Sequence, residues 1–208
     1  MLSEYPKEVK MKDGSNFVLR PMIRHDEDGL YRFYVKLGEN VRKYLRNDIQ
    51  SRVLIEKWCR NLDYDKVLPI LAEKNGSIIA NATLHREKRG WSKHIGEIRM
   101  TISSEYRYLG LGTLLVGEVI RLAEKSGLEK LMVKIVTSRD YVIKFFEQND
   151  FVRVSVLKNF VKSIHENRYR DIAILVKDLK SRKLVEPIPD FRALPKMSPE
   201  FQESCELR

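Results

Sequence analysis

The sequence predicts an α/β protein in which helices cover the faces of a mixed β-sheet. Segments with strand-like alternation and segments with helical spacing follow the order strand, two helices, three strands, helix, strand, helix, two strands. Short turns join the three consecutive strands, which predicts an antiparallel meander. Two glycines, Gly110 and Gly112, separate this meander from the next helix.

The predicted strands are short apolar or alternating runs bounded by turn residues. Asn75-Gly76 is typical of a tight hairpin turn and joins two of them. The mostly apolar run 131–136 is typical of a central strand. A polar, basic stretch, residues 158–170, is expected to link the last two strands. The seven predicted strands are residues 16–21, 67–73, 77–87, 94–103, 131–136, 151–157 and 171–176.

Four helices are predicted from apolar residues at helical spacing and from their end signals. Asp26 is expected to cap a helix that ends near Leu37, just before Gly38. A second helix is expected to begin at Asn47 or Asp48. The third follows Gly110-Leu111-Gly112 and runs to Ser126, and the fourth runs from Arg139 to Asn149. The apolar faces predicted for the last three helices are Val53, Leu54, Trp58 and Leu62, then Leu115, Val119 and Leu122, then Val142, Phe145 and Phe146.

The 208 residues are enough for one domain with a sizeable core. Beyond about Leu179 the periodic pattern stops, and Pro187, Pro189, Pro195 and Pro199 predict an extended segment. We therefore expect one domain over residues 1–178 and a proline-containing tail over residues 179–208.

The composition narrows the partners and the location of the protein. Lys and Arg number 39 against 29 acidic residues, and this net charge of +10 favours anionic partners: CoA phosphates, acidic protein surfaces or nucleic acid. The two cysteines cannot form a disulfide framework, and no histidine has metal-ligand spacing, so no metal is expected. No apolar run suits a membrane span or a signal peptide, which predicts a cytoplasmic protein.

The segment Gly110-Leu111-Gly112 has the features of an anion site. Glycine lets backbone N–H groups approach a ligand closely because it has no Cβ. The start of the following helix offers unpaired N–H donors and the positive end of the helix dipole. This combination suits a pyrophosphate. The third glycine of the dinucleotide fingerprint and the Gly-Lys-Ser/Thr ending of a P-loop are both absent.

The segment from Gly96 to Leu115, which includes Arg107-Tyr108-Leu109-Gly110-Leu111-Gly112, resembles the signature segment of GNAT acetyltransferases. In that family the pattern Gln/Arg-x-x-Gly-x-Gly/Ala follows a strand and opens a helix. The element order over residues 16–178 is similar to the GNAT fold from its first strand to its last.

The resemblance implies acetyl-CoA as cosubstrate and implies its site. In GNAT proteins two central strands splay apart and the pantetheine arm lies in the gap; here these strands would be 94–103 and 131–136. Backbone amides from Leu109 to Thr113 would hold the pyrophosphate, and the backbone of Met100 and Ile102 would hold the arm. The implied cosubstrate-binding residues are Met100, Thr101, Ile102, Arg107, Tyr108, Leu109, Gly110, Leu111, Gly112 and Thr113.

Glu97 is the predicted catalytic base. A lysine-like amine has a pKa of about 10.4 and must lose a proton before it attacks a thioester. A carboxylate whose pKa is raised by burial can accept that proton. The spacing from Glu97 to the glycines is similar to that in many GNAT protein acetyltransferases. A strand glutamate paired with Arg99 is the structural alternative, and His85 and His94 are alternative bases.

The chain departs from the family pattern in the last helix. GNAT members often carry there a tyrosine that protonates the leaving thiolate, whereas the matching position holds Phe146. Tyr141 is an alternative proton donor. Asp150 replaces the usual glycine at the end of the helix, in a left-handed position that aspartate tolerates.

The resemblance implies direct transfer of an acetyl group from acetyl-CoA to a primary amine in a ternary complex. The signature is closest to GNAT domains that act on protein lysines, and small polyamines, amino acids or antibiotics are alternative acceptors. Phe146 favours a second hypothesis, a non-catalytic acyl-CoA sensor. Net charge alone favours a third, a nucleic-acid-binding module. A homodimer is a further expectation.

Overall fold

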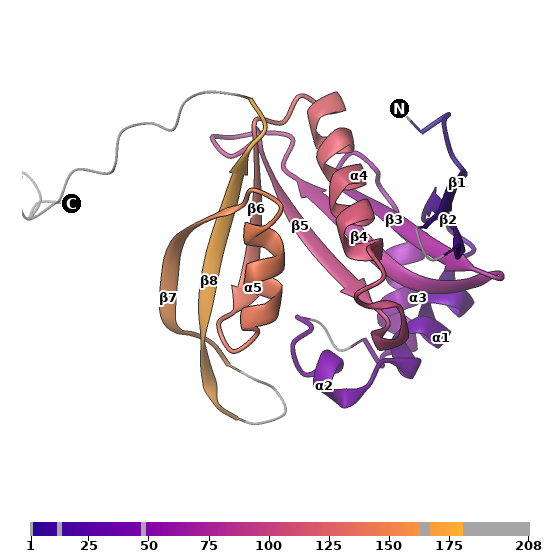
Figure 1. The fold of residues 1–208 in the computed structure, drawn as a ribbon, viewed down its shortest axis with the longest axis horizontal. Helices are drawn as coiled ribbons and strands as arrows, with labels where there is room; N and C mark the ends of the chain where they lie inside the picture. The colour runs from indigo at the N-terminus through magenta and orange to yellow at the C-terminus, as the bar shows by residue number, and fades with distance from the viewer. Residues whose placement is uncertain (1, 12–13, 47–48, 163–166, 181–208) are drawn as a thin grey trace, which may run out of the picture.

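The computed structural model describes residues 2–11, 14–46, 49–162 and 167–180. They form one eight-stranded sheet in the order β1-β2-β3-β4-β5-β6-β8-β7, shown in Figure 1. All neighbouring strands are antiparallel except β5 and β6, so the predicted mixed sheet is confirmed. The strands are β1 Lys7–Lys10, β2 Asn16–Pro21, β3 Val67–Lys74, β4 Ser77–Arg86, β5 Ile95–Ile102, β6 Lys130–Val136, β7 Val152–Lys162 and β8 Tyr169–Asp178.

The sheet has one strand more than the seven predicted. The additional strand, β1, pairs along β2 at the edge of the sheet. Its sequence, Lys-Glu-Val-Lys, has a single apolar residue and gives no strand signal. The predicted link 158–170 is also partly wrong, because β7 continues to Lys162 and β8 begins at Tyr169. Pairing between the two strands outweighs their polar composition there, and two register shifts accommodate the extra residues of β7.

The helices are α1 Glu27–Lys36, α2 Glu39–Arg42, α3 Arg52–Arg60, α4 Leu111–Lys125 and α5 Asp140–Glu147. The start predicted for the second helix, at residues 47–48, lies outside the described residues. Helix α3 itself begins at Arg52, and the Ser51 side chain caps it by accepting from Leu54 N. The predicted apolar face is partly right: Trp58 and Leu62 pack against the core, but Ile55 and Cys59 are its buried centre and Val53 is 74% exposed.

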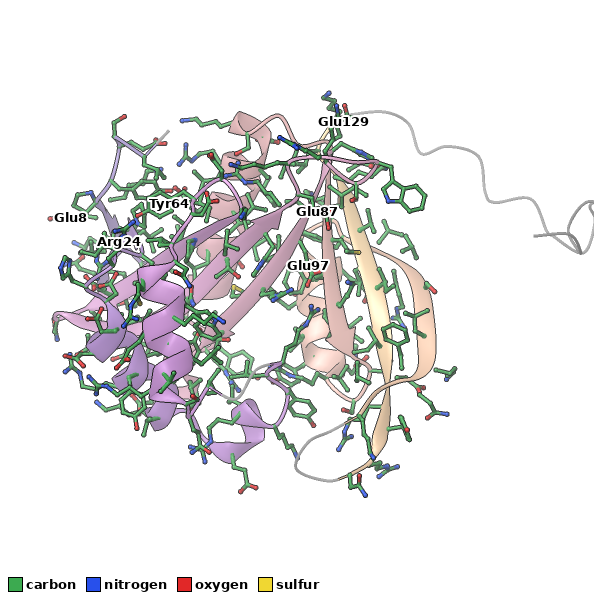
Figure 2. The ribbon with its side chains drawn as sticks, turned by 180° about the vertical axis from the view of Figure 1, so that it is seen from behind. Glu8, Arg24, Tyr64, Glu87, Glu97 and Glu129 are labelled. Atoms are coloured by element: carbon green, nitrogen blue, oxygen red, sulfur yellow. The ribbon has the colours of Figure 1, made fainter. Side chains whose placement is uncertain are left out.

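The two faces of the sheet carry separate apolar cores. Helices α4 and α5 pack on one face, where Leu115, Val119 and Leu122 are fully buried as predicted. Helices α1 and α3 pack on the opposite face, over β3 and β4. Seen from that side, the helices cover only one half of the sheet and leave β5, β6, β8 and β7 open (Figure 2).

The central strands β5 and β6 diverge along their length. They pair at only three positions, Ile95–Lys130, Gly96–Leu131 and Glu97–Met132. Beyond Glu97, β5 stays paired with β4 and β6 stays paired with β8, so a gap opens between their carboxyl ends. This is the predicted splay. Among the described residues no helix has the length and apolar character that crossing a membrane requires.

Candidate functional site

A cleft of about 1570 Å³ lies in the gap between β5 and β6. Val133 and Ile135 of β6 line it from the side of α4 and α5. Arg99 and Lys134 line it from the opposite side, where both contact Glu97. The cleft therefore joins the two faces of the sheet, and two molecules approaching from opposite faces could meet in it.

The predicted glycine turn forms one wall of this cleft. Gly110 precedes the first residue of α4 with a φ of +84°, a left-handed conformation that glycine adopts without strain. A Cβ at Gly110 would lie 2.9 Å from Met11 Cε, and one at Gly112 would lie 3.2 Å from the Phe145 ring. The absence of a side chain at both glycines thus leaves the backbone at the start of α4 accessible and lets it pack closely against Met11 and Phe145. With Arg107 they line the cleft beside the unpaired N–H groups of the helix start.

Most of the predicted cosubstrate residues meet in this cleft. Met100, Thr101 and Ile102 line it beyond the last pair between β5 and β6, where the edge of β5 facing β6 has no strand partner among the described residues. Tyr108 and Thr113 line it as well. The lining does not include Leu109 or Leu111; the Leu111 side chain is 1% exposed in the core, which leaves only its backbone for a ligand.

Glu97 lies on the open face of β5, opposite His85 of β4 (Figure 2). Its carboxylate accepts hydrogen bonds from Arg46 Nη1 at 2.5 Å, Arg99 Nε at 3.0 Å and Lys134 Nζ at 3.2 Å. Burial alone would raise its pKa, but the three cations outweigh burial and hold the pKa of Glu97 below its usual range. The condition considered from the sequence, a pKa raised by burial, is therefore not met.

The Glu97 side chain is only 14% exposed, and it does not line the cleft although its three cationic partners do. Arg46, from the connection between α2 and α3, lies over it and is 40% exposed. The carboxylate is ionised at neutral pH and is covered by a cation. The ion pair between Glu97 and Arg99, the structural alternative predicted from the sequence, is thus present within a larger cluster that also contains Arg46 and Lys134.

His85 lines the cleft next to Glu97. Burial, together with the charge of Arg99, lowers the pKa of His85 to about 4, so its ring is neutral at pH 7. Its Nε2 lies 3.0 Å from the Thr83 hydroxyl. The second histidine considered from the sequence, His94, does not line the cleft; its backbone carbonyl accepts from Glu129 and Lys130.

Phe146 is 5% exposed and packs edge-on against Phe145 and Phe151 at the inner wall of the cleft. It offers no proton donor. Tyr141, the phenol of the same helix, also lines the cleft, and its hydroxyl accepts from Arg139 Nη2 at 2.9 Å. Asp150 has a φ of +64°, which confirms the left-handed position predicted for it.

The structure adds cleft residues that the sequence did not reveal. Tyr44, from the connection between α2 and α3, lies 5.1 Å from the Arg139 guanidinium and 5.9 Å from that of Arg170. Tyr44 and Arg46 share one connection, but Arg139 and Arg170 come from two other, distant segments, and the four residues share no motif. Lys134 could have been found, because alternation along β6 places it on the face of Glu97. Among the described residues, no group of three or more His, Cys, Asp or Glu side chains could hold a metal.

Comparisons with known proteins give one consistent result. The family model described as "Acetyltransferase (GNAT) family" matches residues 26–151, more than half of the chain. Acetyltransferase Pat of Mycolicibacterium smegmatis is 24% identical over 147 residues, which are 69% of this chain and 43% of that protein. The chain thus spans less than half the length of this relative.

Solved structures share the fold at low sequence identity. The GNAT domain of S. lividans PAT superposes with a TM-score of 0.71 at 15% identity, covering 85% of this chain and 98% of that one. A GNAT-family acetyltransferase of Streptococcus pneumoniae gives 0.66 at 22% identity, covering 78% and 99%. Ribosomal-protein-alanine N-acetyltransferase of Brucella melitensis gives 0.66 at 20% identity, covering 77% and 98%.

Proposed function

The chain belongs to the acetyltransferase (GNAT) family, and from this premise we propose that it transfers an acetyl group from acetyl-CoA to a primary amine. The observation that carries the proposal is the divergence of β5 and β6 beside the glycine turn at the start of α4. It brings a helix start of the kind that suits an anion and an unpaired strand edge into one cleft.

The residues of the cleft fit acetyl-CoA in two respects. A side chain at Gly110 or Gly112 would fill the space next to the helix start, where the backbone amides from Leu109 to Thr113 would hold a pyrophosphate. The open edge of β5 at Met100–Ile102 offers backbone groups to the amides of a pantetheine arm. When bound, acetyl-CoA supplies the acetyl group as a reactive thioester.

We propose that Glu97 accepts the proton of the attacking amine. Its carboxylate is ionised at neutral pH, as a base must be, and it adjoins the cleft through Arg46 and Lys134. The acceptor amine would have to displace Arg46 from Glu97 or reach the carboxylate through water. His85, neutral at pH 7, is the alternative base.

Phe146 stands where many GNAT proteins carry a tyrosine that protonates the leaving thiolate, so the thiolate must leave without that proton donor. A thiol with a pKa of about 8.5 can leave as the anion. Tyr141, whose hydroxyl is hydrogen-bonded to Arg139, is the phenol of α5 that lines the cleft. We propose that it is the proton donor if one is used.

For the acceptor we propose a protein amine, with a lysine as the first choice. Support comes from the names of similar proteins, which include Acetyltransferase Pat and a ribosomal-protein-alanine N-acetyltransferase. A small polyamine, an amino acid or an antibiotic is the alternative. A cytoplasmic location and a homodimer stay predictions from the sequence.

The first test is titration calorimetry with acetyl-CoA. We expect the wild type to bind and Gly110→Glu to lose binding, because a carboxylate would fill the proposed pyrophosphate site. Gly117→Glu controls for the added carboxylate, since Gly117 is exposed on the same helix with open space around it. Equal binding by both variants, or no binding by folded wild type, would contradict the proposed donor site.

A second candidate function is a non-catalytic acyl-CoA sensor. The buried Phe146 and the cover of Arg46 over Glu97 favour it. Tight acetyl-CoA binding without transfer to a panel of peptides, polyamines and amino acids would support this function against catalysis.

A further inference from the structure

The cleft is strongly cationic. A single carboxylate, that of Asp63, lines it among the described residues. The lysine and arginine side chains that line it are Arg42, Lys43, Arg46, Lys57, Lys66, Arg99, Arg107, Lys134, Arg139, Lys162 and Arg170. The net charge of the whole chain, +10, does not account for this imbalance, since the chain as a whole carries 29 acidic residues against 39 basic ones. A cleft with charges of one sign concentrates ligands of the opposite sign.

Glu97 does not neutralise the cations nearest the reacting centre. Arg46, Arg99 and Lys134 share its one carboxylate, which leaves about two positive charges uncompensated in a partly buried site. Partly buried charges are screened much less by salt than exposed ones. An anion is therefore attracted here, and an ammonium is repelled.

A second cationic group lies where the connection after α2 meets β8 and the start of α5. Arg139 and Arg170 approach the Tyr44 ring within 6 Å, and this places two guanidinium groups on one rigid aromatic residue. Nε of Arg139 is buried and has no hydrogen-bond partner in the part of the chain that the structure describes. A guanidinium presents a planar fork that pairs with both oxygens of a carboxylate or phosphate.

This group lies apart from the proposed pyrophosphate site. Side chains two residues apart on a strand share a face, so Arg170 faces the same side of the sheet as Ile172 of β8. Ile172 pairs with Val136 of β6, which shares the open face with Lys134, so Arg170 lies on the open face as well. The helix start at Gly110 lies on the side of α4. The cations around Tyr44 therefore lie on the face of the sheet opposite α4, the side from which we expect the acceptor to enter.

We propose, resting on the proposed amine transfer, that the acceptor is an acidic peptide segment whose amine stands beside a carboxylate or phosphate, bound by Arg139 and Arg170. The cleft, at about 1570 Å³, exceeds the roughly 300–1,000 Å³ of small-ligand pockets, which favours a peptide sharing it with acetyl-CoA. The anionic neighbour would attract the acceptor, and the surrounding cations would favour its amine in the neutral, nucleophilic form.

The test uses blocked peptides of equal length with one lysine, flanked by Glu, by Gln, by Arg or by phosphoserine. Both affinity, by fluorescence anisotropy, and kcat/KM are measured on the full chain. We expect the Glu peptide to exceed the Gln peptide by about tenfold or more, as for charge-assisted hydrogen bonds, and the Arg peptide to be the poorest. The phosphoserine peptide shows whether carboxylate or phosphate is preferred.

Arg139→Gln and Arg170→Gln should each reduce the preference for Glu over Gln at least several-fold. Arg24→Gln is the matched control, because Arg24 is exposed, does not line the cleft and lies far from Glu97 (Figure 2). It removes the same charge and should keep the preference. A loss of acetyl-CoA affinity in the Arg139 and Arg170 variants, with the peptide preference intact, would assign these cations to the cosubstrate and overturn the proposal.

The two readouts separate this proposal from the proposed function. Tight, Arg139-dependent binding of acidic peptides without acetylation would contradict the transferase function and support the acidic-peptide site. Acetylation of all peptides at equal rate and affinity would support the transferase and overturn the acidic-peptide site. An oligonucleotide that binds more tightly than the acidic peptides, and depends on Arg139, would also overturn it in favour of nucleic acid.

Discussion

Arg46 donates a hydrogen bond of 2.5 Å to the Glu97 carboxylate from 51 residues away in the sequence. The contact joins the connection between α2 and α3 to the open face of β5. It lowers the pKa of Glu97, and the arginine side chain lies between the carboxylate and the cleft. The same arginine thus favours the ionised form of the proposed base and limits access to it.

Replacement of Glu97 by Gln tests the base directly. We expect kcat to fall by about 100-fold or more, since proton transfer by a positioned group contributes that much, while acetyl-CoA affinity stays near wild type. Steady-state kinetics with a lysine peptide and calorimetry with acetyl-CoA measure the two quantities. His85→Gln is the companion variant. Normal turnover by Glu97→Gln with a large loss in His85→Gln would assign the base to His85.

Arg46→Gln should change the pH profile of kcat/KM. Removal of this cation raises the pKa of Glu97 toward its ordinary value, because Arg46 is the first of the charges that lower it. The carboxylate must be ionised to accept a proton, so the acidic limb of the profile should move to higher pH. Arg24→Gln, which removes an exposed arginine away from the cleft, should leave the limb in place. If the acidic limb of the profile did not move in Arg46→Gln, Glu97 would not be the group that accepts the proton.

The direction of the Glu97 pKa illustrates what the sequence could not provide. Only Arg99 is near Glu97 in sequence, whereas Arg46 and Lys134 reach it from 51 and 37 residues away. Burial was foreseeable from the apolar neighbours, but the distant cations decide the sign. The glycine turn and the strand order were predictable because each depends on short-range signals, such as the Asn75-Gly76 hairpin.

The same reason explains the elements that were missed. β1 is stabilised by pairing with β2. Its sequence, Lys-Glu-Val-Lys, is too polar to predict a strand, because the pairing depends on the neighbouring strand and not on apolar residues of β1 itself. The arrangement of Arg139 and Arg170 around Tyr44 depends on three segments that only the folded sheet brings together. Their positions could not be read from spacing, although the excess of basic residues was evident from the composition.

Glu118 of α4 anchors the N-terminal segment and should make stability depend on pH. It accepts from Lys7 Nζ at 2.8 Å, from Arg121 Nη2 at 2.7 Å and from the Tyr5 hydroxyl. Burial opposes ionisation, but these partners lower the pKa of Glu118 to about 2. A depressed pKa contributes stability that is complete above the unfolded pKa, about 4.3, and is lost as pH falls through 2.

Glu118→Gln should therefore lower the free energy of unfolding at pH 7 by about 1–3 kcal/mol, as expected for hydrogen bonds to a charged group. Urea titrations at pH 7 and pH 3 measure the difference, which should shrink at the lower pH. Glu8→Gln, at an exposed position on β1 that Figure 2 labels, is the control and should change little at either pH. An equal loss in both variants would argue against the Glu118 anchor.

Phe146→Tyr tests whether the missing phenol limits turnover. The ring is buried at the inner wall of the cleft, where many GNAT proteins carry a tyrosine, so we expect a hydroxyl added there to reach the reacting centre. We expect kcat to rise several-fold below pH 8.5, where a thiolate of that pKa gains most from protonation. Stopped assays across pH 6 to 9 measure this rise. Phe145→Tyr places the same group on the adjacent ring and should give no such gain. A rise in neither variant would mean that departure of the thiolate does not limit the rate.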